Sequence, residues 1–384
     1  MIRTSIRKQS GFSLIEALVA MALTLIIVSA ATLAFKDATQ VNHTITLQSD
    51  MSDNLRAGLN MMVQDLILTG SGIPTGGIPI PNKPNSTSSC STIPAPNRPS
   101  LNAGATFPAC NFVLPSIEPG NQLGPFITAP DANQGLPSNS SSYTDEISIL
   151  YADNTINLAG VPINQPSGTT AGCPNGSISV AGDTATFDST CINLTTLSNS
   201  GLQVQPGDLI LFSNSLGNAI QTVTSVSGQT LGFASGDAFG FNGRTDATQG
   251  TIKSIENSGC TTSANCWPTT TLTRIWMISY YLDNVTDPTH VRLIRRVNFN
   301  TGTPVGETIE NLQFTYNFID GVTNPSNQAV IPSANTEAQI RSVNVFLGAR
   351  SNYPITQGAS SRYARSNLTT QVSLRSMAYV NRYQ

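Results

Sequence analysis

The chain has 384 residues, of which 39% are hydrophobic and 11% are charged. A chain of this length can bury at least one sizeable core and could hold two domains, so it is globular and not disordered. The formal charge of -3 and the pI near 5.4 give the protein no positive electrostatic potential with which to bind phosphate backbones, so we expect no nucleic-acid partner.

The N-terminal segment combines a basic start with a long apolar run. Arg3, Arg7 and Lys8 precede the run, and between residues 12 and 35 the only charge is Glu16. As a helix these residues would measure roughly 36 Å at about 1.5 Å per residue, which is enough to cross a bilayer. The positive-inside rule keeps the basic flank in the cytoplasm and exports the residues beyond the apolar run.

Three interpretations of this segment compete. A secretory signal peptide needs a small-residue cleavage site, and Ser29-Ala30-Ala31 is a tolerable one. A plain membrane anchor is the second. Neither explains Glu16, because an acidic residue inside a membrane segment costs about 2.5 to 3.5 kcal/mol on insertion scales. The third interpretation is that Glu16 is functional and has a partner outside the segment.

The stretch "SGFSLIEALVAM" supplies such a partner, because it resembles the junction of type IV prepilins and pseudopilins. The resemblance implies that a membrane prepilin peptidase cuts after Gly11 and methylates the new N-terminal amine of Phe12. It also implies that Glu16 pairs with the N-terminal amine of a neighbouring subunit during assembly. A small residue lets a protease approach the backbone, and a carboxylate one turn into a helix is favoured by the helix dipole.

The helix is expected to continue beyond Phe35, over about residues 12 to 69. The side chains at three- and four-residue steps are mostly apolar, Gly70, Gly72 and Pro74 end the run, and charges such as Asp65 fall mostly off the apolar face. The positions on that face are Val41, Ile45, Gln48, Ser52, Leu55, Leu59, Met62 and Leu66.

After the helix the sequence predicts a long loop and then a β-rich part. Residues 74–140 hold 13 of the 23 prolines, so regular structure is not expected there. From about residue 145, mostly alternating apolar and polar residues predict antiparallel strands. Their sequences are "DEISILYA", "DLILFSN", "AIQTVTSV", "TRIWMISYYLD", "HVRLIRRVNF", "LQFTYNFID", "IRSVNVFLGA" and "TTQVSLRSMAY".

The predicted fold class is α+β, in which a long N-terminal helix, half transmembrane and half amphipathic, packs on a mainly antiparallel β head. The expected organisation is a removable leader (1–11), a transmembrane and assembly helix (12–35), an amphipathic helix (36–70), a Pro/Ser/Asn-rich loop region (71–144) and the head (145–384).

The six cysteines fall as close neighbours along the chain, which suggests local disulfides formed in an oxidising compartment. Six cysteines allow 15 connectivities, and six free thiols are the alternative. The expected neighbours are Cys90 with Cys110, Cys173 with Cys191, and Cys260 with Cys266. No C-x-x-C spacing occurs, so we expect no metal site.

Three later segments, "DNLRAGLNMMVQDLILTGSGIP", "VGETIENLQFTYNF" and "IRSVNVFLGARS", are similar in order and character to those of PilW-type minor pilins. The resemblance implies a minor pilin that primes the tip complex of a type IV pilus. Its partners would be other major and minor pilins, the prepilin peptidase and the inner-membrane assembly platform. Its location would be the inner membrane, with the head in the periplasm, and then the pilus surface. The alternatives are a tip adhesin and a type II secretion pseudopilin.

No enzyme signature is present, so we expect neither enzymatic activity nor a cofactor. His43 and His290 are interpreted as solvated surface residues. The stretches 131–135 ("DANQG") and 283–287 ("DNVTD") faintly resemble calcium loops, but neither has the following glutamate of an EF-hand, and both are interpreted as turns. Four aromatic residues could line a binding surface but are interpreted as core: Trp267, Trp276, Tyr280 and Tyr281.

Overall fold

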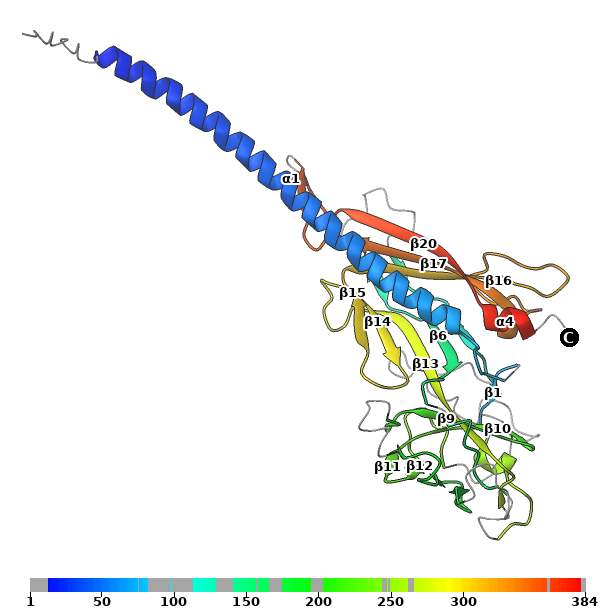
Figure 1. The fold of residues 1–384 in the computed structure, drawn as a ribbon. Coiled ribbons are helices and arrows are strands. Elements are labelled where there is room, and N and C mark those ends of the chain that lie inside the picture. Colours follow the sequence, from blue (N-terminus) through cyan, green and yellow to red (C-terminus); the bar gives the residue numbers. More distant parts are fainter. Residues whose placement is uncertain are drawn as a thin grey trace, which may run out of the picture.

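The computed structural model is a long helix that runs into a β-rich head (Figure 1). It describes residues 13–74, 76–81, 98, 113–128, 141–156, 158–165, 175–194, 203–243, 247, 249–261, 266–357 and 360–380.

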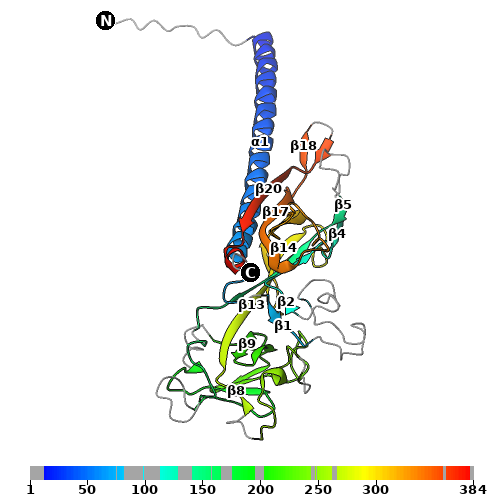
Figure 2. The ribbon, with the colours of Figure 1, turned by 90° about the vertical axis from the view of Figure 1, so that its right-hand side faces the viewer.

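Helix α1 spans Leu14–Leu68, a run of 55 residues and about 83 Å. The N-terminal half stands free, while the C-terminal half lies against the head (Figures 1 and 2). The helix ends where the sequence predicts, because Thr69 leaves the helical conformation, with a ψ angle of 127°, and Gly70 and Gly72 take positive φ angles of 79° and 69°. The predicted long N-terminal helix is therefore confirmed.

The face of α1 that packs on the head differs in part from the predicted one. Leu55, Met62 and Leu66 are buried as expected, whereas Val41 and Ile45 are exposed. Positions 48 and 52 were expected on the packed face, but the residues buried there are their neighbours Leu47 and Met51. Alternating steps of three and four residues average 3.5 residues, whereas a straight helix has 3.6 residues per turn. The predicted apolar stripe therefore rotates slowly around the helix and away from the face that packs on the head. Asp65, expected off this face, is buried.

A seven-stranded antiparallel sheet runs through the head in the order β10-β9-β13-β14-β15, with β6 paired to β13 and β3 paired to β6. The first half of the 13-residue strand β13 pairs with β9 and the second half with β6. The strands are β3 (Ile117–Gly120), β6 (Glu146–Ala152), β9 (Leu209–Asn214), β10 (Gly217–Thr222), β13 (Thr271–Asp283), β14 (Arg292–Val297) and β15 (Thr303–Gly306).

A second sheet of three strands has the order β16-β17-β20. Its strands are β16 (Ile309–Phe318), β17 (Ile340–Arg350) and β20 (Arg365–Ser373), and helix α4 (Arg375–Val380) follows them. The main hydrophobic core lies where the C-terminal half of α1, this sheet and strands β3, β6, β13 and β14 meet. We call this part of the head the body.

The described residues between 154 and 270 form a second part, which we call the distal module. It has its own hydrophobic core and lies at the end of the molecule opposite the N-terminus of α1 (Figures 1 and 2). Besides β9 and β10 it contains a four-stranded sheet ordered β11-β12-β8-β7. Its further elements are β7 (Ser177–Ile178), β8 (Thr184–Thr186), β11 (Ser225–Ser227), β12 (Thr230–Gly232) and the 3-10 helix η2 (Ile252–Ile255).

Three small hairpin-like pairs and one short helix complete the described elements. The pairs are β1 (Ile78–Pro79) with β2 (Val113–Leu114), β4 (Phe126–Thr128) with β5 (Ser141–Tyr143), and β18 (Ile355–Gln357) with β19 (Ser360–Arg362); the helix is η3 (Glu337–Gln339).

Three details of the predicted β part are wrong. Short strands β1 to β4 occur within the region where no regular structure was expected, because each of them pairs with another strand, as β3 does with β6. The predicted strand over residues 369–379 ends at Ser373, and its last residues begin α4. The stretch predicted as one strand over residues 219–226 is split between β10 and β11 in two different sheets. The predicted α+β class with an antiparallel head is confirmed.

Candidate functional site

The start of α1 is closed by a reciprocal cap between Ser13 and Glu16. The Ser13 Oγ accepts a hydrogen bond of 3.2 Å from the Glu16 backbone N–H, and the Ser13 N–H donates one of 3.1 Å to the Glu16 Oε2. Both residues are exposed. The carboxylate therefore lies at the positive end of the helix dipole and is open to a further donor. The predicted Gly11 and Phe12 lie outside the described residues.

Every residue from Leu14 to Phe35 is exposed, and the large apolar side chains among them are 53 to 83% exposed. By length and composition α1 could cross a membrane, and none of its apolar window is buried against the head, unlike the core helix of a soluble protein. Length and composition are shared with a signal sequence, so the distinction between an anchor and a signal rests on Glu16 and the motif around it.

The polar side chains inside the apolar segment are satisfied within the helix itself. Thr24, Ser29 and Thr32 each donate to the carbonyl four residues earlier, at 2.8, 2.6 and 2.6 Å. These bonds leave the hydroxyls of the segment paired without water, as a hydrocarbon environment requires.

At the other end of α1, Asp65 fastens the helix to the body. Arg295 of β14 binds both carboxylate oxygens, with Nε 2.6 Å from Oδ2 and Nη2 3.1 Å from Oδ1. The hydroxyls of Tyr280 and Tyr151 donate to Oδ2 and Oδ1 at 2.5 and 3.3 Å. Three strands of the sheet therefore meet on one helical side chain, and a bidentate arginine gives this contact a fixed geometry.

The electrostatics of this group follow from its burial. Burial, together with the Asp65 charge, raises the pKa of both Tyr280 and Tyr151, so both phenols stay protonated and donate. Burial alone would lower the pKa of Arg295, but the hydrogen bond and charge of Asp65 outweigh it and raise that pKa. The sequence pattern missed this anchor because Arg295 lies 230 residues from Asp65.

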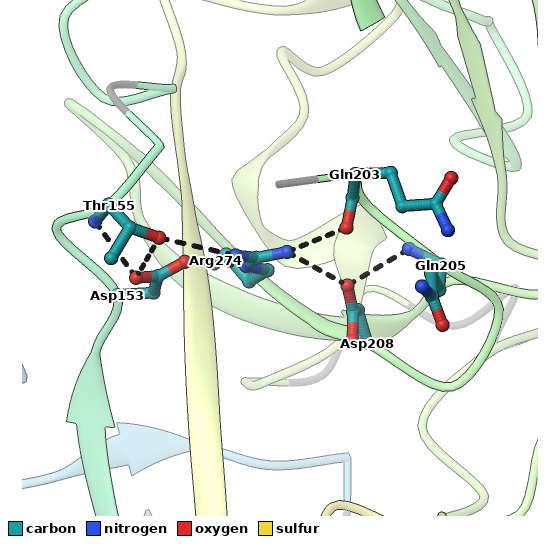
Figure 3. Close-up of polar contacts among 6 residues, drawn as sticks. All are labelled: Asp153, Thr155, Gln203, Gln205, Asp208 and Arg274. Carbon is teal, nitrogen blue, oxygen red and sulfur yellow. Dashed lines mark hydrogen bonds and ion pairs between the residues drawn. The ribbon is translucent and has the colours of Figure 1, made fainter. Parts of the chain in front are cut away.

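A second arginine, Arg274 near the start of β13, joins the distal module to the body (Figure 3). Its Nε donates to the Asp153 Oδ2 at 2.7 Å, and its Nη1 donates to the Gln203 carbonyl at 2.9 Å and the Asp208 Oδ2 at 3.4 Å. The Asp153 N–H in turn donates to the Arg274 carbonyl at 2.8 Å. The buried Arg274 guanidinium thus binds Asp153, where the chain leaves β6 and the body, and Asp208, directly before β9.

The two carboxylates beside Arg274 are shifted in opposite directions. Burial opposes ionisation of Asp153, but hydrogen bonds from Thr155 and Arg274 outweigh it and lower the carboxyl pKa. Burial raises the pKa of Asp208, although the Gln205 N–H and Arg274 oppose this. Asp153 therefore carries the lasting negative charge of the junction.

A third arginine, the buried Arg98, comes from the proline-rich region and faces Glu146 and Glu118. Its Nε lies 2.8 Å from the Glu146 Oε1 without hydrogen-bond alignment, and its Nη1 lies 3.8 Å from the Glu118 Oε1. Burial raises the pKa of Glu118 to about 7, and the nearby Glu337 adds to this while Arg98 opposes it. Burial also raises the pKa of Glu146 against the pull of Arg98.

The predicted cysteine pair Cys260–Cys266 is a disulfide. Cys191 is also disulfide-bonded, while Cys90, Cys110 and Cys173 lie outside the described residues. Within the described ranges, the one group of three or more potential metal ligands consists of Glu256 and these two bonded cysteines. A disulfide sulfur is not a thiolate ligand, so this group does not form a metal centre.

Most of the remaining candidate residues lie where the sequence analysis expected them, in turns, in the core or on the surface. Asp283 accepts hydrogen bonds from the N–H groups of Val285 and Thr286, which is a turn motif. Trp267, Tyr280 and Tyr281 are buried, and Trp276 is half-buried. His43 is exposed, and the half-buried His290 lies 2.9 Å from Asp287. The stretch 131–135 lies outside the described residues.

Comparison with known proteins supports the N-terminal interpretation. Residues 6–32 match the family described as "Prokaryotic N-terminal methylation motif", which contains Gly11, Phe12 and Glu16. No curated protein matches the chain. A type IV-like pilin, TTHA1219 from Thermus thermophilus, is similar at 9% identity over 48% of this chain and 94% of its own, with a TM-score of 0.17, too low for a structural argument. Residues 6–32 therefore carry a prepilin-type methylation motif, which makes this segment similar to the N-terminal segments of the type IV pilin superfamily.

Proposed function

We propose that the protein is a minor pilin that takes part in priming the tip complex of a type IV pilus. The observation that carries the proposal is Glu16, an exposed carboxylate at the start of a fully exposed apolar helix that continues without a break to Asp65, its anchor in the head. Such a helix transmits an assembly contact at one end to the head at the other.

In this proposal the leader is cut after Gly11 by a prepilin peptidase, which also methylates the amine of Phe12. Glu16 then pairs with the N-terminal amine of a neighbouring subunit. A carboxylate and an ammonium are each costly in hydrocarbon, so their pairing selects one register between two helices. The head would lie in the periplasm until the assembly platform moves the subunit from the inner membrane into the fibre. The protein performs no chemistry of its own.

A minor role is favoured over that of a bulk fibre subunit by the architecture of the head. The distal module adds 117 residues between β6 and β13, two strands that pair directly with each other. A copy of this module on every subunit of a fibre would be a large addition to the repeating unit. The segments that resemble PilW-type minor pilins, on α1, β16 and β17, belong to the body and not to the module.

The test begins with the intact mass and N-terminal sequence of the protein from membranes and sheared pili of its native host. We expect a start at methylated Phe12. Replacement Glu16→Ala should then abolish incorporation into pili while the protein remains in the membrane, and Asp50→Ala, an exposed carboxylate on the same helix, should leave incorporation unchanged. A mature start near Thr32, or normal piliation with Glu16→Ala, would refute the proposal.

The position of the distal module favours a second function, that of a tip adhesin. The module has its own core and lies at the end farthest from the membrane helix (Figure 1). Replacing residues 154–270 by a short turn between β6 and β13 separates the two functions, because an adhesin would lose attachment while pili remain. If the protein is instead a type II secretion pseudopilin, Glu16→Ala should impair protein secretion and not piliation, and the neighbouring genes should be secretion genes.

A further inference from the structure

A cavity of about 390 Å³ opens on the flank of the body, at the junction of β4, the β13–β14 turn, β16 and β17. Figure 2 shows β4 and β5 on the side of the body away from α1. We call it the aromatic cavity, and its volume lies in the range of small-molecule sites. It is lined by Phe126, Ile127, Asn284, Pro288, Thr289, Val291, Glu310, Arg350 and Tyr363.

The polar wall of the aromatic cavity is built from two buried charged side chains. Glu310 and Arg350 each have side chains only 10% exposed, and the Arg350 Nε lies 3.9 Å from the Glu310 Oε2. The other oxygen of Glu310 accepts from the Arg365 Nε at 2.5 Å, whereas Oε2 accepts no hydrogen bond from the described residues. Arg350 donates through Nη2 to the Thr289 carbonyl. A buried acceptor without a donor is costly, so this wall can gain from a ligand that donates.

The apolar walls carry aromatic rings that water still reaches. Phe126 is 46% exposed and Tyr143 beside it is 54% exposed, and the two rings meet edge to face with centroids 5.2 Å apart. Tyr363 lies under the Arg350 guanidinium at 4.3 Å. Exposed aromatic faces next to a hollow are surfaces that an apolar ring face can cover.

The charges in the cavity select against ions. Glu310 lies between Arg350 and Arg365, so an anion would approach the Glu310 carboxylate as well as the two guanidinium groups, and a cation would approach the guanidinium groups as well as Glu310. A neutral ligand that both donates and accepts hydrogen bonds avoids both conflicts. Hydroxyl groups do this, and a sugar ring offers neighbouring hydroxyls on its edge and apolar C–H groups on its face.

We propose that the aromatic cavity binds a neutral saccharide, with its ring against Phe126 and Tyr363 and its hydroxyls between Glu310 and Arg350. The cavity belongs to the body and does not involve Glu16 or the distal module. The proposal is therefore independent of the role of the protein in pilus assembly.

The test uses the full-length protein in a detergent without a sugar headgroup and saturation-transfer NMR. The probes are glucose, galactose and N-acetylglucosamine, with glucuronate and glucosamine as charged counterparts. We expect a signal from at least one neutral sugar, weaker signals from the charged ones, and about fivefold weaker binding in Phe126→Ala, which removes a rim ring. Tyr353→Ala is the matched control, because this exposed tyrosine does not line the cavity.

Three results would overturn the proposal: no neutral sugar signal, tighter binding of a charged sugar, or equal binding by wild type and Phe126→Ala. Thermal unfolding of each variant confirms that it is folded before binding is compared. The variant Glu310→Gln keeps the size of the side chain and should weaken binding further. If Phe126→Ala lowers incorporation into pili while no sugar binds, the cavity instead holds a side chain of a neighbouring subunit, and the saccharide proposal is wrong.

Discussion

Replacing Asp65 by alanine tests whether the head is fastened to α1 through this one carboxylate. The side chain of Asp65 is 8% exposed and that of Arg295 is 24% exposed, and the Tyr280 hydroxyl donates to the same carboxylate. The variant Asp65→Ala leaves the guanidinium without its bidentate partner and a buried hydroxyl without its acceptor.

The magnitude follows from this burial. Removing one partner of a buried ion pair costs about 3–5 kcal/mol, and the partial exposure of Arg295 to water places the cost near the lower end, at about 3 kcal/mol. The combined variant Asp65→Leu, Arg295→Leu, Tyr280→Phe and Tyr151→Phe removes every polar member of this contact. It should recover most of the loss, because well-packed apolar replacements of a buried pair are often neutral.

The assay is urea unfolding of the full-length protein in detergent, with amide hydrogen exchange along α1. In Asp65→Ala, exchange should accelerate over residues 47–66 and stay unchanged over the free half of the helix. The control is Asp53→Ala, an exposed carboxylate of the same helix. If Asp65→Ala costs less than about 1 kcal/mol, or the combined variant is as unstable as the sum of its parts, Asp65 is not the anchor.

Three further predictions concern the other buried contacts. The folded pKa of Glu118 is raised to about 7 from 4.5, so the stability that this protonated group contributes is present below about pH 4.5 and is lost as the pH rises through 7. Between pH 4.5 and about pH 8 the wild type should therefore lose about 3 kcal/mol of stability relative to Glu118→Gln, which does not titrate. Thermal unfolding of both proteins across this pH range measures the difference. Arg274→Met should lower the free energy of unfolding by about 3 kcal/mol in urea unfolding, because it leaves the carboxylates of Asp153 and Asp208 without a counter-charge. Arg274→Lys should not restore this loss, because lysine lacks the planar guanidinium group that binds both sides of the junction. Replacing Cys260 and Cys266 by serine should destabilise the distal module by about 2 kcal/mol, seen as faster amide exchange there and unchanged exchange in α1.

The elements that the sequence predicts are those with a long, regular pattern. Helix α1 is a long apolar and then amphipathic run with a stop signal at Gly70, and strands β13 and β17 are long runs of mostly apolar residues. The strands of the four-stranded sheet are two or three residues long and rich in Ser, Thr and Gly, so no periodicity can form in them. Their existence depends on pairing within the module and not on local preference.

The buried charges could not be predicted for a different reason. A charge in a helix pattern is assigned to the solvent side, because an unpaired buried charge is costly. That rule holds for Lys36 and Asp53, which are exposed, and fails for Asp65, whose partner Arg295 is distant in sequence. A one-dimensional pattern carries no information about such a partner, so the anchor of the helix becomes visible only when β13 and β14 are placed beside α1.

The two carboxylates Glu16 and Asp65 illustrate how one rule leads to opposite outcomes on the same helix. Each lies on an otherwise apolar surface, where it is tolerated only with a donor. Asp65 has a bidentate arginine and two phenols from its own chain, so its contact is complete in the isolated subunit. Among the described residues Glu16 has only the N–H of Ser13 as a donor to its carboxylate, and its surroundings from Leu14 to Phe35 are exposed. The same physical requirement is met within the molecule at one end of α1, and at the other end the proposed function assigns it to a neighbouring subunit.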